Sequence, residues 1–168
     1  ICFINYTHIQ KGMMDESLRK SLIAYVKNGG GFFAIHSATD GGWPEYIDMI
    51  GGNFRGHPWG AGGTWDISNE DPKHPIVKDV HGGKGFKLKD ELYVYNDFDR
   101  GDQRVLMALD MKSEVNGTRK GPREDNDYAL AWVKKYGDGR VFVSAFGHNK
   151  EVFYNPEILK MWVEGFRY

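Results

Sequence analysis

The first part of the chain alternates between short apolar runs and apolar residues at helical spacing. Ile1–Asn5 and Gly31–Ile35 are apolar runs too short to form helices, which predicts two buried strands. Between them we expect a helix with Asp15 as its N-cap and Gly29 as its end. The apolar positions that recur at helical spacing in this helix are Leu18, Leu22 and Val26.

The next segment is rich in glycine. A short helix is predicted over Trp43–Ile50, and the pair Gly51-Gly52 ends it. The glycine content of Asn53–Gly63, which includes FRGHPWGAGG, is too high for regular structure. We therefore interpret this stretch as an ordered loop.

Strand patterns dominate the second half of the chain. Stretches rich in β-branched and aromatic residues predict strands over Thr64–Ser68, Leu92–Asn96, Arg104–Met111 and Tyr128–Lys135. A further strand, Arg140–Phe146, is separated from the last of these by Gly137-Asp138-Gly139. A turn of this composition favours a hairpin, so these two strands are expected to be antiparallel.

The chain ends in a predicted helix. Asn155 is its expected N-cap and Pro156 its first helical residue. The apolar stripe expected to face the core consists of Leu159, Trp162, Val163 and Phe166. Strands that are first interleaved with helices and later joined by hairpins indicate an α/β sandwich with a mixed sheet and an antiparallel extension.

Composition limits the partners of this chain. Its 168 residues predict one domain, and 22 Lys+Arg against 23 Asp+Glu give a net charge of -1, so we expect neither nucleic acid nor an anionic membrane as a partner. No apolar run is long enough for a transmembrane helix.

The single cysteine, Cys2, allows no internal disulfide and leaves the compartment open. Because the sequence starts in a strand pattern without an initiator methionine, we expect its N-terminus, with any signal peptide, to have been cut away.

Two histidines follow predicted strands directly. His36 comes after Gly31–Ile35, and His148 comes one residue after Arg140–Phe146. Ligands collect outside the carboxyl ends of parallel strands, so both imidazoles lie at one rim if these strands run in the same direction. The small residues Ala34 and Ala38 on either side of His36 are typical of a tight strand-to-helix turn that presents a reactive side chain. The alternative interpretation is a hydrogen-bonded core histidine without chemistry.

Four segments, taken in order, carry a family resemblance. They are GGGFFAIHSA, GGNFRGHP, DPKHPIVKDV…DELYVY and WVKKYGDGRVFVSAFGH. This combination resembles the trehalose-utilisation (ThuA-like) family over nearly the whole chain, with the first strand and helix of the family missing. The resemblance implies one domain with a class I glutamine-amidotransferase-like fold: a flavodoxin-like three-layer sandwich with a mixed, mainly parallel sheet and an antiparallel hairpin extension.

The position of His36 separates this chain from the amidotransferases that share the implied fold. Their turn after the strand carries a cysteine nucleophile, and here it carries an imidazole, while the only thiol belongs to Cys2 on another strand. Thioester formation needs a thiolate, so glutamine hydrolysis is not expected. An imidazole at this point can act as a general acid or base, or bind a metal through a neutral nitrogen.

The matched motifs supply the candidate site residues. The resemblance implies His36, His57, Glu91 and His148 as the catalytic set. Three imidazoles and one carboxylate suit a divalent metal such as zinc, and they equally suit a metal-free acid/base site, since no closely spaced motif such as HExxH decides between the two. The residues expected to bind substrate are Trp59, Ser37 and Asn149.

Other polar and aromatic residues are given structural interpretations. We expect His74, which precedes a proline, to set a turn, His8 and His81 to be exposed, and Asp90 to cap or orient rather than react. The aromatic residues that could stack on sugar rings but more often belong to cores are Trp43, Trp65 and Tyr93.

Two classes of function remain open at this point. The first is a carbohydrate-active enzyme (a lyase, hydrolase or isomerase) of trehalose or related disaccharide utilisation, which acts on an oxidised keto-sugar by histidine-based or metal-assisted chemistry. The second is a non-catalytic sugar-binding or interaction module on the same fold. No glycine-rich dinucleotide fingerprint follows a strand, so NAD is not expected as a cofactor. A sheet edge left exposed by the missing strand would allow pairing with another copy or an adjoining domain.

Overall fold

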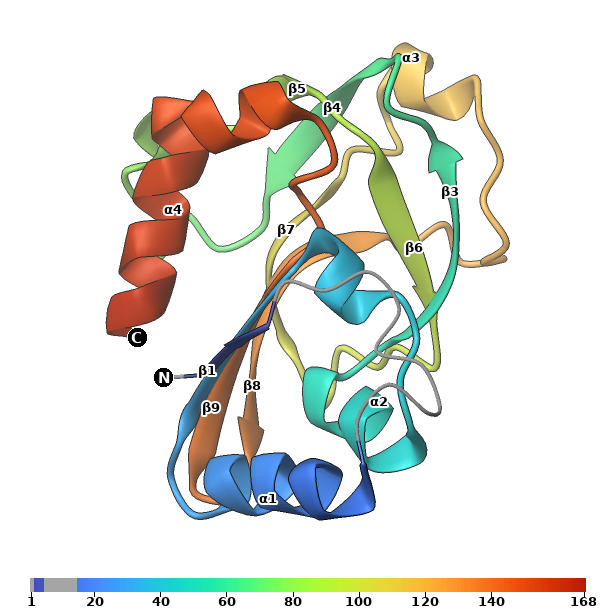
Figure 1. Cartoon of the computed structure of the whole chain (residues 1–168). Helices are drawn as coiled ribbons and strands as arrows, with labels where there is room; N and C mark the ends of the chain where they lie inside the picture. Colours follow the sequence, from blue (N-terminus) through green and yellow to red (C-terminus); the bar gives the residue numbers. More distant parts are fainter. Residues whose placement is uncertain (1, 5–14) are drawn as a thin grey trace.

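A seven-stranded sheet forms the centre of the protein in a computed structural model that describes residues 2–4 and 15–168 (Figure 1). Its strand order is β1-β2-β9-β8-β7-β4-β5. Strands β1, β2 and β9 are parallel to one another, and every other neighbouring pair is antiparallel. The strands of this sheet are β1 Cys2–Ile4, β2 Gly31–Ile35, β4 Thr64–Asn69, β5 Phe86–Lys89, β7 Arg104–Leu109, β8 Ala129–Tyr136 and β9 Gly139–Ser144.

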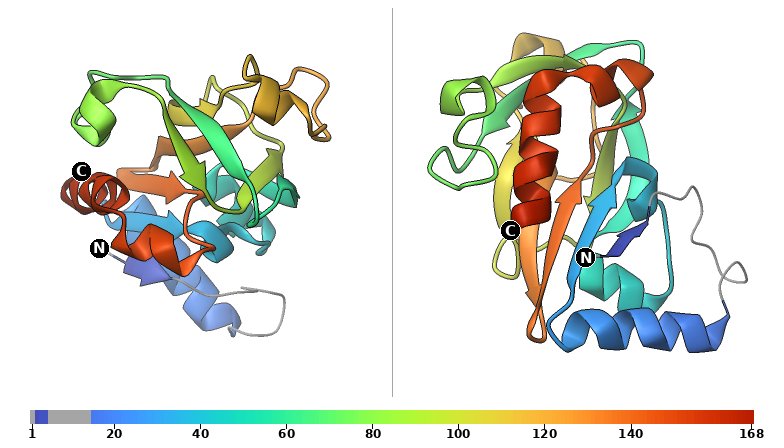
Figure 2. Two further views of the ribbon diagram at one scale, coloured as in Figure 1. Left: turned by 90° about the horizontal axis from the view of Figure 1, so that it is seen from above. Right: turned by 60° about the vertical axis from the view of Figure 1, so that its left-hand side comes forward.

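Helices cover both faces of the sheet. The indole of Trp162 in α4 donates to Ser144 Oγ in β9 at 3.0 Å, and the indole of Trp132 in β8 donates to the carbonyl of Ile50 in α2 at 2.8 Å. Trp132 is paired with Val143, so their side chains point to the same face of the sheet. Ser144 is the next residue of β9, and its side chain points to the opposite face because successive side chains of a strand alternate. Helices α4 and α2 therefore lie on opposite faces of the sheet. The right-hand view of Figure 2 shows α4 over one of these faces. The α-helices of the described residues are α1 Glu16–Lys27, α2 Pro44–Ile50, α3 Glu114–Gly117 and α4 Pro156–Arg167.

Helix α1 forms where the sequence predicts it. The Asp15 side chain accepts a hydrogen bond from the N–H of Leu18 at 3.0 Å, as an N-cap should, and Leu22 and Val26 are buried. The last turn of the helix packs against the β8–β9 hairpin, where the N–H of Asp138 donates to the Lys27 carbonyl at 2.9 Å.

A second, two-stranded sheet pairs β3 (Asn53–Trp59) with β6 (Leu92–Asn96). The expectation of a loop over Asn53–Gly63 is therefore wrong for its first seven residues. Strand β3 carries Gly56 at φ 138°, and its register against β6 shifts on both sides of that glycine. Glycine and proline obscure the alternation of an edge strand that pairs on one side only, which is why composition indicates a loop.

The α/β class, the mixed sheet and the antiparallel β8–β9 hairpin are confirmed, but the sheet is mostly antiparallel rather than mainly parallel. A parallel pair needs a crossover connection of about a dozen residues or more, usually through a helix. After α2 the chain runs through strands without a long crossover helix until α4, so the later strands pair antiparallel. Strand β5 was not predicted from the sequence, and residues 1 and 5 of the predicted first strand lie outside the described residues.

The predicted inner stripe of α4 is only partly correct. Trp162 faces the core, but Leu159, Val163 and Phe166 are 39 %, 46 % and 40 % exposed. The buried positions are Ile158, Met161 and Trp162, so the helix is rotated from the expected orientation. Gly165 allows this packing, because a Cβ there would lie 2.2 Å from the Phe142 ring. No helix among the described residues is long and apolar enough to cross a membrane.

Candidate functional site

His36 occupies the tight turn that joins β2 to the 3-10 helix η1 (His36–Thr39). Its backbone has φ 43°, in the left-handed region that a residue with a side chain rarely adopts. The ring is 4 % exposed, and its Nδ1 lies 2.8 Å from the carbonyl oxygen of Ala145. Burial is the main cause that lowers the pKa of His36, so the ring is neutral near pH 7. The turn thus holds one imidazole in a fixed orientation.

His148 lies at the same rim of the sheet as His36. Strand β2 runs parallel to β9 (Figure 1), with Ile35 opposite Ser144. Each histidine follows the carboxyl end of its strand. The centroids of the two imidazole rings are 5.4 Å apart. The prediction that both rings meet at one edge is confirmed.

Two adjacent carboxylates between β5 and β6 face this rim. Asp90 is fully buried, and it accepts hydrogen bonds from the backbone N–H groups of Gly147, His148 and Asn149 at 2.7, 3.1 and 2.8 Å. It orients the loop after β9, as predicted for it. The next residue, Glu91, turns its carboxylate toward the histidines instead.

Glu91 is the centre of a cluster with three histidines. Its Oε2 lies 3.5 Å from His36 Nε2 and 3.1 Å from His148 Nδ1, and its Oε1 lies 3.3 Å from His57 Nδ1. The Glu91 side chain is only 12 % exposed, whereas those of His57 and His148 are 54 % and 45 % exposed. We call these four residues the His–Glu cluster. The structure brings together every residue predicted for the catalytic set.

His57 reaches Glu91 from the irregular part of β3. It lies between Gly56 and Trp59, where the register with β6 shifts. Irregularities of this kind change the direction in which a strand side chain points. The bulge therefore explains how a histidine on the second sheet reaches the rim of the first.

Aromatic rings pack against the histidines of the cluster. Tyr93 in β6 is buried, and its ring centroid lies 4.0 Å from that of His36 and 4.4 Å from that of Phe54. Burial raises the pKa of the Tyr93 hydroxyl above its usual range, so the group stays protonated. The sequence predicts Tyr93 as a ring that could stack on sugars but more often belongs to a core, and its burial agrees with the second of these. Its contact with His36 is not predicted, although its place two residues after Glu91 puts both side chains on the same side of the chain.

The residues predicted to bind substrate have other surroundings. The expectation for Trp59 is wrong, because its ring is fully buried and its indole donates to the carbonyl of Asn116 at 3.1 Å. The Asn149 amide donates to the carbonyls of Ala61 and Lys89, so it ties two loops together beside the cluster. Ser37, directly after His36 in η1, is partly exposed, and its role stays a prediction.

The other two histidines of the described residues, His74 and His81, lie outside the cluster. His74 is buried and its Nδ1 accepts a hydrogen bond from the N–H of Ile76 at 3.3 Å, which confirms a structural role. His81 is exposed, as predicted, and stacks on Phe86, while His8 lies outside the described residues. The indole rings of Trp43 and Trp65 are buried in the core.

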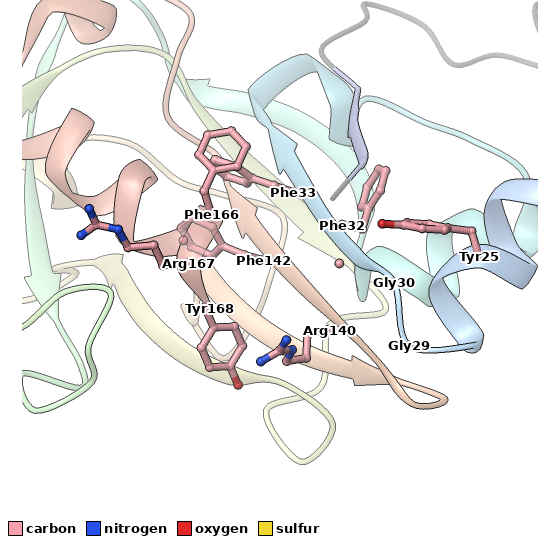
Figure 3. A pocket seen from close by; sticks show the side chains of 12 residues that line it. Tyr25, Gly29, Gly30, Phe32, Phe33, Arg140, Phe142, Phe166, Arg167 and Tyr168 are labelled. Atoms are coloured by element: carbon pink, nitrogen blue, oxygen red, sulfur yellow. The ribbon is translucent and has the colours of Figure 1, made fainter.

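A separate cavity of about 340 Å³ lies at the opposite end of β2, beside Gly30 and Arg140 (Figure 3). Its walls are formed by aromatic residues, glycines and arginines, with Phe166 and Tyr168 from the C-terminal end of the chain. None of the described residues that line it is a histidine, aspartate or glutamate, so acid/base chemistry is assigned to the His–Glu cluster instead.

The arrangement of the His–Glu cluster suits proton transfer. A buried neutral imidazole faces a carboxylate, and two partly exposed imidazoles border the same carboxylate. The ligand atoms of His36, Glu91 and His148 all lie within 4.8 Å of one another, so these three residues could also hold a metal ion. The turn at His36 carries no thiol, which leaves it without the nucleophile of an amidotransferase.

Comparison with solved structures identifies related folds. A ThuA-like protein from Bacteroides uniformis is 22% identical with a TM-score of 0.74, and the alignment covers 91% of this chain and 63% of that protein. A ThuA-like protein from Parabacteroides merdae is 19% identical with a TM-score of 0.64, covering 87% and 59%. A cytoplasmic protein from Salmonella typhimurium is 16% identical with a TM-score of 0.59, covering 93% and 61%. This chain therefore spans about three fifths of the length of these proteins.

The family assignment comes from the sequence match. No curated protein matches the chain significantly. The family model described as trehalose utilisation matches residues 1–168. The chain therefore belongs to the trehalose-utilisation (ThuA) family.

Proposed function

We propose that this chain is a carbohydrate-active enzyme that processes an oxidised keto-sugar derived from trehalose or a related disaccharide, with the His–Glu cluster as its reacting centre. The family description supports a role in disaccharide utilisation. The observation that carries the proposal is the convergence of His36, His57 and His148 on the carboxylate of Glu91.

The structure of the turn at His36 favours chemistry over a purely structural role. A left-handed backbone at a residue with a side chain costs about 1–2 kcal/mol. Strain of this kind is typical of sites that must hold a reactive group in one orientation. The result is a buried Nε2 that faces Glu91 rather than the apolar core.

A keto-sugar matches the chemistry that these groups can perform. A carbonyl group acidifies the C–H bond on the adjacent carbon, so a base within hydrogen-bond distance can remove that proton, and the electron pair forms an enediolate. Return of the proton to the neighbouring carbon completes an isomerisation. Departure of an oxygen substituent from the carbon beyond completes an elimination, in which a second group protonates the leaving oxygen.

The residues of the cluster can divide these tasks. The imidazoles of His57 and His148 are partly exposed, so both are accessible to a sugar, and imidazole is the side chain most often used for general acid/base catalysis. The Glu91 carboxylate contacts both rings, so it lies next to each group that would take part in proton transfer. The same groups could activate water for hydrolysis, so product analysis distinguishes the three reaction classes.

The proposal is tested by turnover of 3-keto-trehalose and of related 3-keto-disaccharides, with the unoxidised sugars as controls. Wild-type protein should consume the keto-sugar, and His36→Ala and His148→Ala should abolish consumption. The matched control is His81→Ala, an exposed histidine outside the cluster, which should retain wild-type turnover. Sugar binding without turnover by the wild type would instead support a binding module. Wild-type turnover by both cluster variants would overturn the proposed site.

A further inference from the structure

We infer that His36 Nε2, His148 Nδ1 and one carboxylate oxygen of Glu91 form a binding site for a divalent transition metal, with zinc as the first candidate. These three ligand atoms come from the turn after β2, the loop after β9 and the connection between β5 and β6. Binding of the metal is independent of the proposed function, whereas its use in turnover rests on that function.

The hydrogen bond of His36 fixes which nitrogen can bind a metal. Nδ1 lies 2.8 Å from the carbonyl oxygen of Ala145, and a carbonyl oxygen can only accept, so Nδ1 carries the ring proton. In the neutral ring, Nε2 is then an unprotonated acceptor. Histidines that bind metals usually donate their other N–H to a backbone carbonyl or carboxylate in this way.

The Nε2 atom has no hydrogen-bond partner although it is buried. It is one of the few buried side-chain atoms among the described residues for which no hydrogen bond is found. The atom that faces it, at 3.5 Å, is Oε2 of Glu91, which is also an acceptor when ionised. Two buried acceptors that face each other repel, and a cation between them removes the repulsion.

A metal ion binds the neutral form of a histidine, so the unprotonated Nε2 of His36 can bind it directly.

The distances fit coordination by one ion. Donors about 2.1 Å from a tetrahedral zinc ion stand about 3.4 Å from one another. Glu91 Oε2 lies 3.5 Å from His36 Nε2 and 3.1 Å from His148 Nδ1. The full set spans no more than 4.8 Å, so a small adjustment of the partly exposed His148 ring completes the geometry.

The donor set selects the class of metal. Two imidazoles and one carboxylate favour zinc and other first-row transition metals, whereas magnesium and calcium prefer sites composed of oxygen ligands. Three protein ligands leave a coordination position free, as in catalytic zinc sites. His57 contacts the other carboxylate oxygen, Oε1, so it orients Glu91 and remains available for proton transfer.

A metal at this position would add a Lewis acid to the proposed reaction. Its free position could accept the carbonyl oxygen of the keto-sugar and stabilise the charge that develops there when the adjacent proton is removed. No electron transfer is involved, so the reaction needs no oxidant or reductant.

Metal titration tests the site without any sugar. The protein is stripped with a chelator and dialysed, and Zn²⁺ binding is then measured by calorimetry and by elemental analysis. The visible absorption of bound Co²⁺ reports the coordination geometry. We expect one equivalent of Zn²⁺ per chain. Changes to groups that only orient metal ligands commonly weaken binding 10–100-fold, so Glu91→Gln and His148→Gln should each weaken it by about 100-fold or more.

Two controls keep the result interpretable. His81→Gln removes an exposed histidine outside the cluster and should bind zinc like the wild type. His148→Gln changes a partly exposed side chain, so it tests the site even if a His36 variant fails to fold. Absence of stoichiometric binding in the wild type would overturn the inference, and so would unchanged affinity in both Glu91→Gln and His148→Gln.

The outcomes also separate this inference from the proposed function. If zinc binds in the cluster but no keto-sugar is consumed, the metal site stands and the proposed function fails. If protein shown to be metal-free consumes the sugar at the wild-type rate and binds no zinc, the function stands and the metal site fails.

Discussion

The backbone N–H of His148 donates a hydrogen bond to Oδ1 of Asp90 at 3.1 Å. Asp90 also accepts from Gly147 and Asn149, so one buried carboxylate fixes the whole turn that carries the histidine. Glu91, its neighbour in the chain, then contacts the side chain of the same histidine. Two adjacent acidic residues thus act on the backbone and on the side chain of His148.

Asp90→Asn should weaken this turn, because an amide has one acceptor oxygen where three N–H groups need partners. Hydrogen bonds to a charged group contribute about 1.5–3 kcal/mol each, so we expect a loss of roughly 3 kcal/mol in the free energy of unfolding. Urea denaturation measures it, with Asp138→Asn in the exposed hairpin turn as the control. Equal stability of the two variants would contradict the role of Asp90.

Gly147→Ala should displace His148. Gly147 has φ 125°, and a Cβ there would lie 3.0 Å from Ile35 Cγ2 and 3.6 Å from His36 Cβ. A side chain in this conformation costs about 1–3 kcal/mol. We expect lower stability and reduced keto-sugar turnover. Gly60→Ala is the matched control, because a Cβ at Gly60 meets nothing within 4 Å; a similar effect of both changes would refute the steric argument.

The strained backbone of His36 predicts an unusual order of stability. At φ 43° glycine is free of the steric cost that any other residue meets. His36→Gly should therefore be about 1 kcal/mol more stable than His36→Ala, although alanine is normally the more favourable residue. Both variants lack the imidazole and should be inactive. Thermal denaturation of the pair measures the difference, and a more stable alanine variant would argue against the strain.

Stability should decrease on mild acidification because of His36 and His74. Burial is the main cause that lowers the pKa of each, with the Arg104 charge as a further cause for His74. Below pH 6.5, the usual histidine pKa, the unfolded chain binds more protons than the folded chain, so stability falls as the pH falls. The slope is at most about 1.4 kcal/mol per pH unit for each histidine.

Urea midpoints at pH 7.5 and 5.5 measure this dependence. In His74→Asn the amide oxygen can replace Nδ1 as acceptor for Ile76, and the loss of stability between the two pH values should be smaller than in the wild type. His81→Asn, at an exposed position, should keep the wild-type dependence. A wild-type dependence in His74→Asn would exclude its contribution.

The sequence predicts the rim of the sheet better than the surface around it. Short apolar runs and a hairpin turn were sufficient to place the ends of β2 and β9, and their parallel pairing brings His36 and His148 together. Glu91 and His57 could be assigned only through the family motifs, because their approach depends on the β5–β6 connection and on the bulge at Gly56. Such long-range geometry leaves no local pattern in the chain.

Trp59 is a residue for which local composition gives the wrong prediction. Its glycine-rich surroundings resemble an open loop, yet the ring packs on Tyr128 with centroids 4.8 Å apart and is fully buried. Two of its partners, Asn116 in α3 and Tyr128 just before β8, lie far away in the sequence. Trp59→Phe should therefore reduce stability by about 1–3 kcal/mol, from the lost indole hydrogen bond and the smaller ring, without changing the KM for the sugar. A raised KM at unchanged stability would restore the substrate contact expected from the sequence.

The most direct measurement of the central claim is the kcat/KM for a 3-keto-disaccharide of the wild type and of Glu91→Gln, which keeps the shape of the side chain and removes its charge. Glu91 contacts all three histidines of the cluster. Loss of a group that acts in proton transfer typically costs 10²–10⁴-fold, so kcat/KM should fall by about 100-fold or more while the fold is retained. Equal kcat/KM in a correctly folded Glu91→Gln protein would contradict the account.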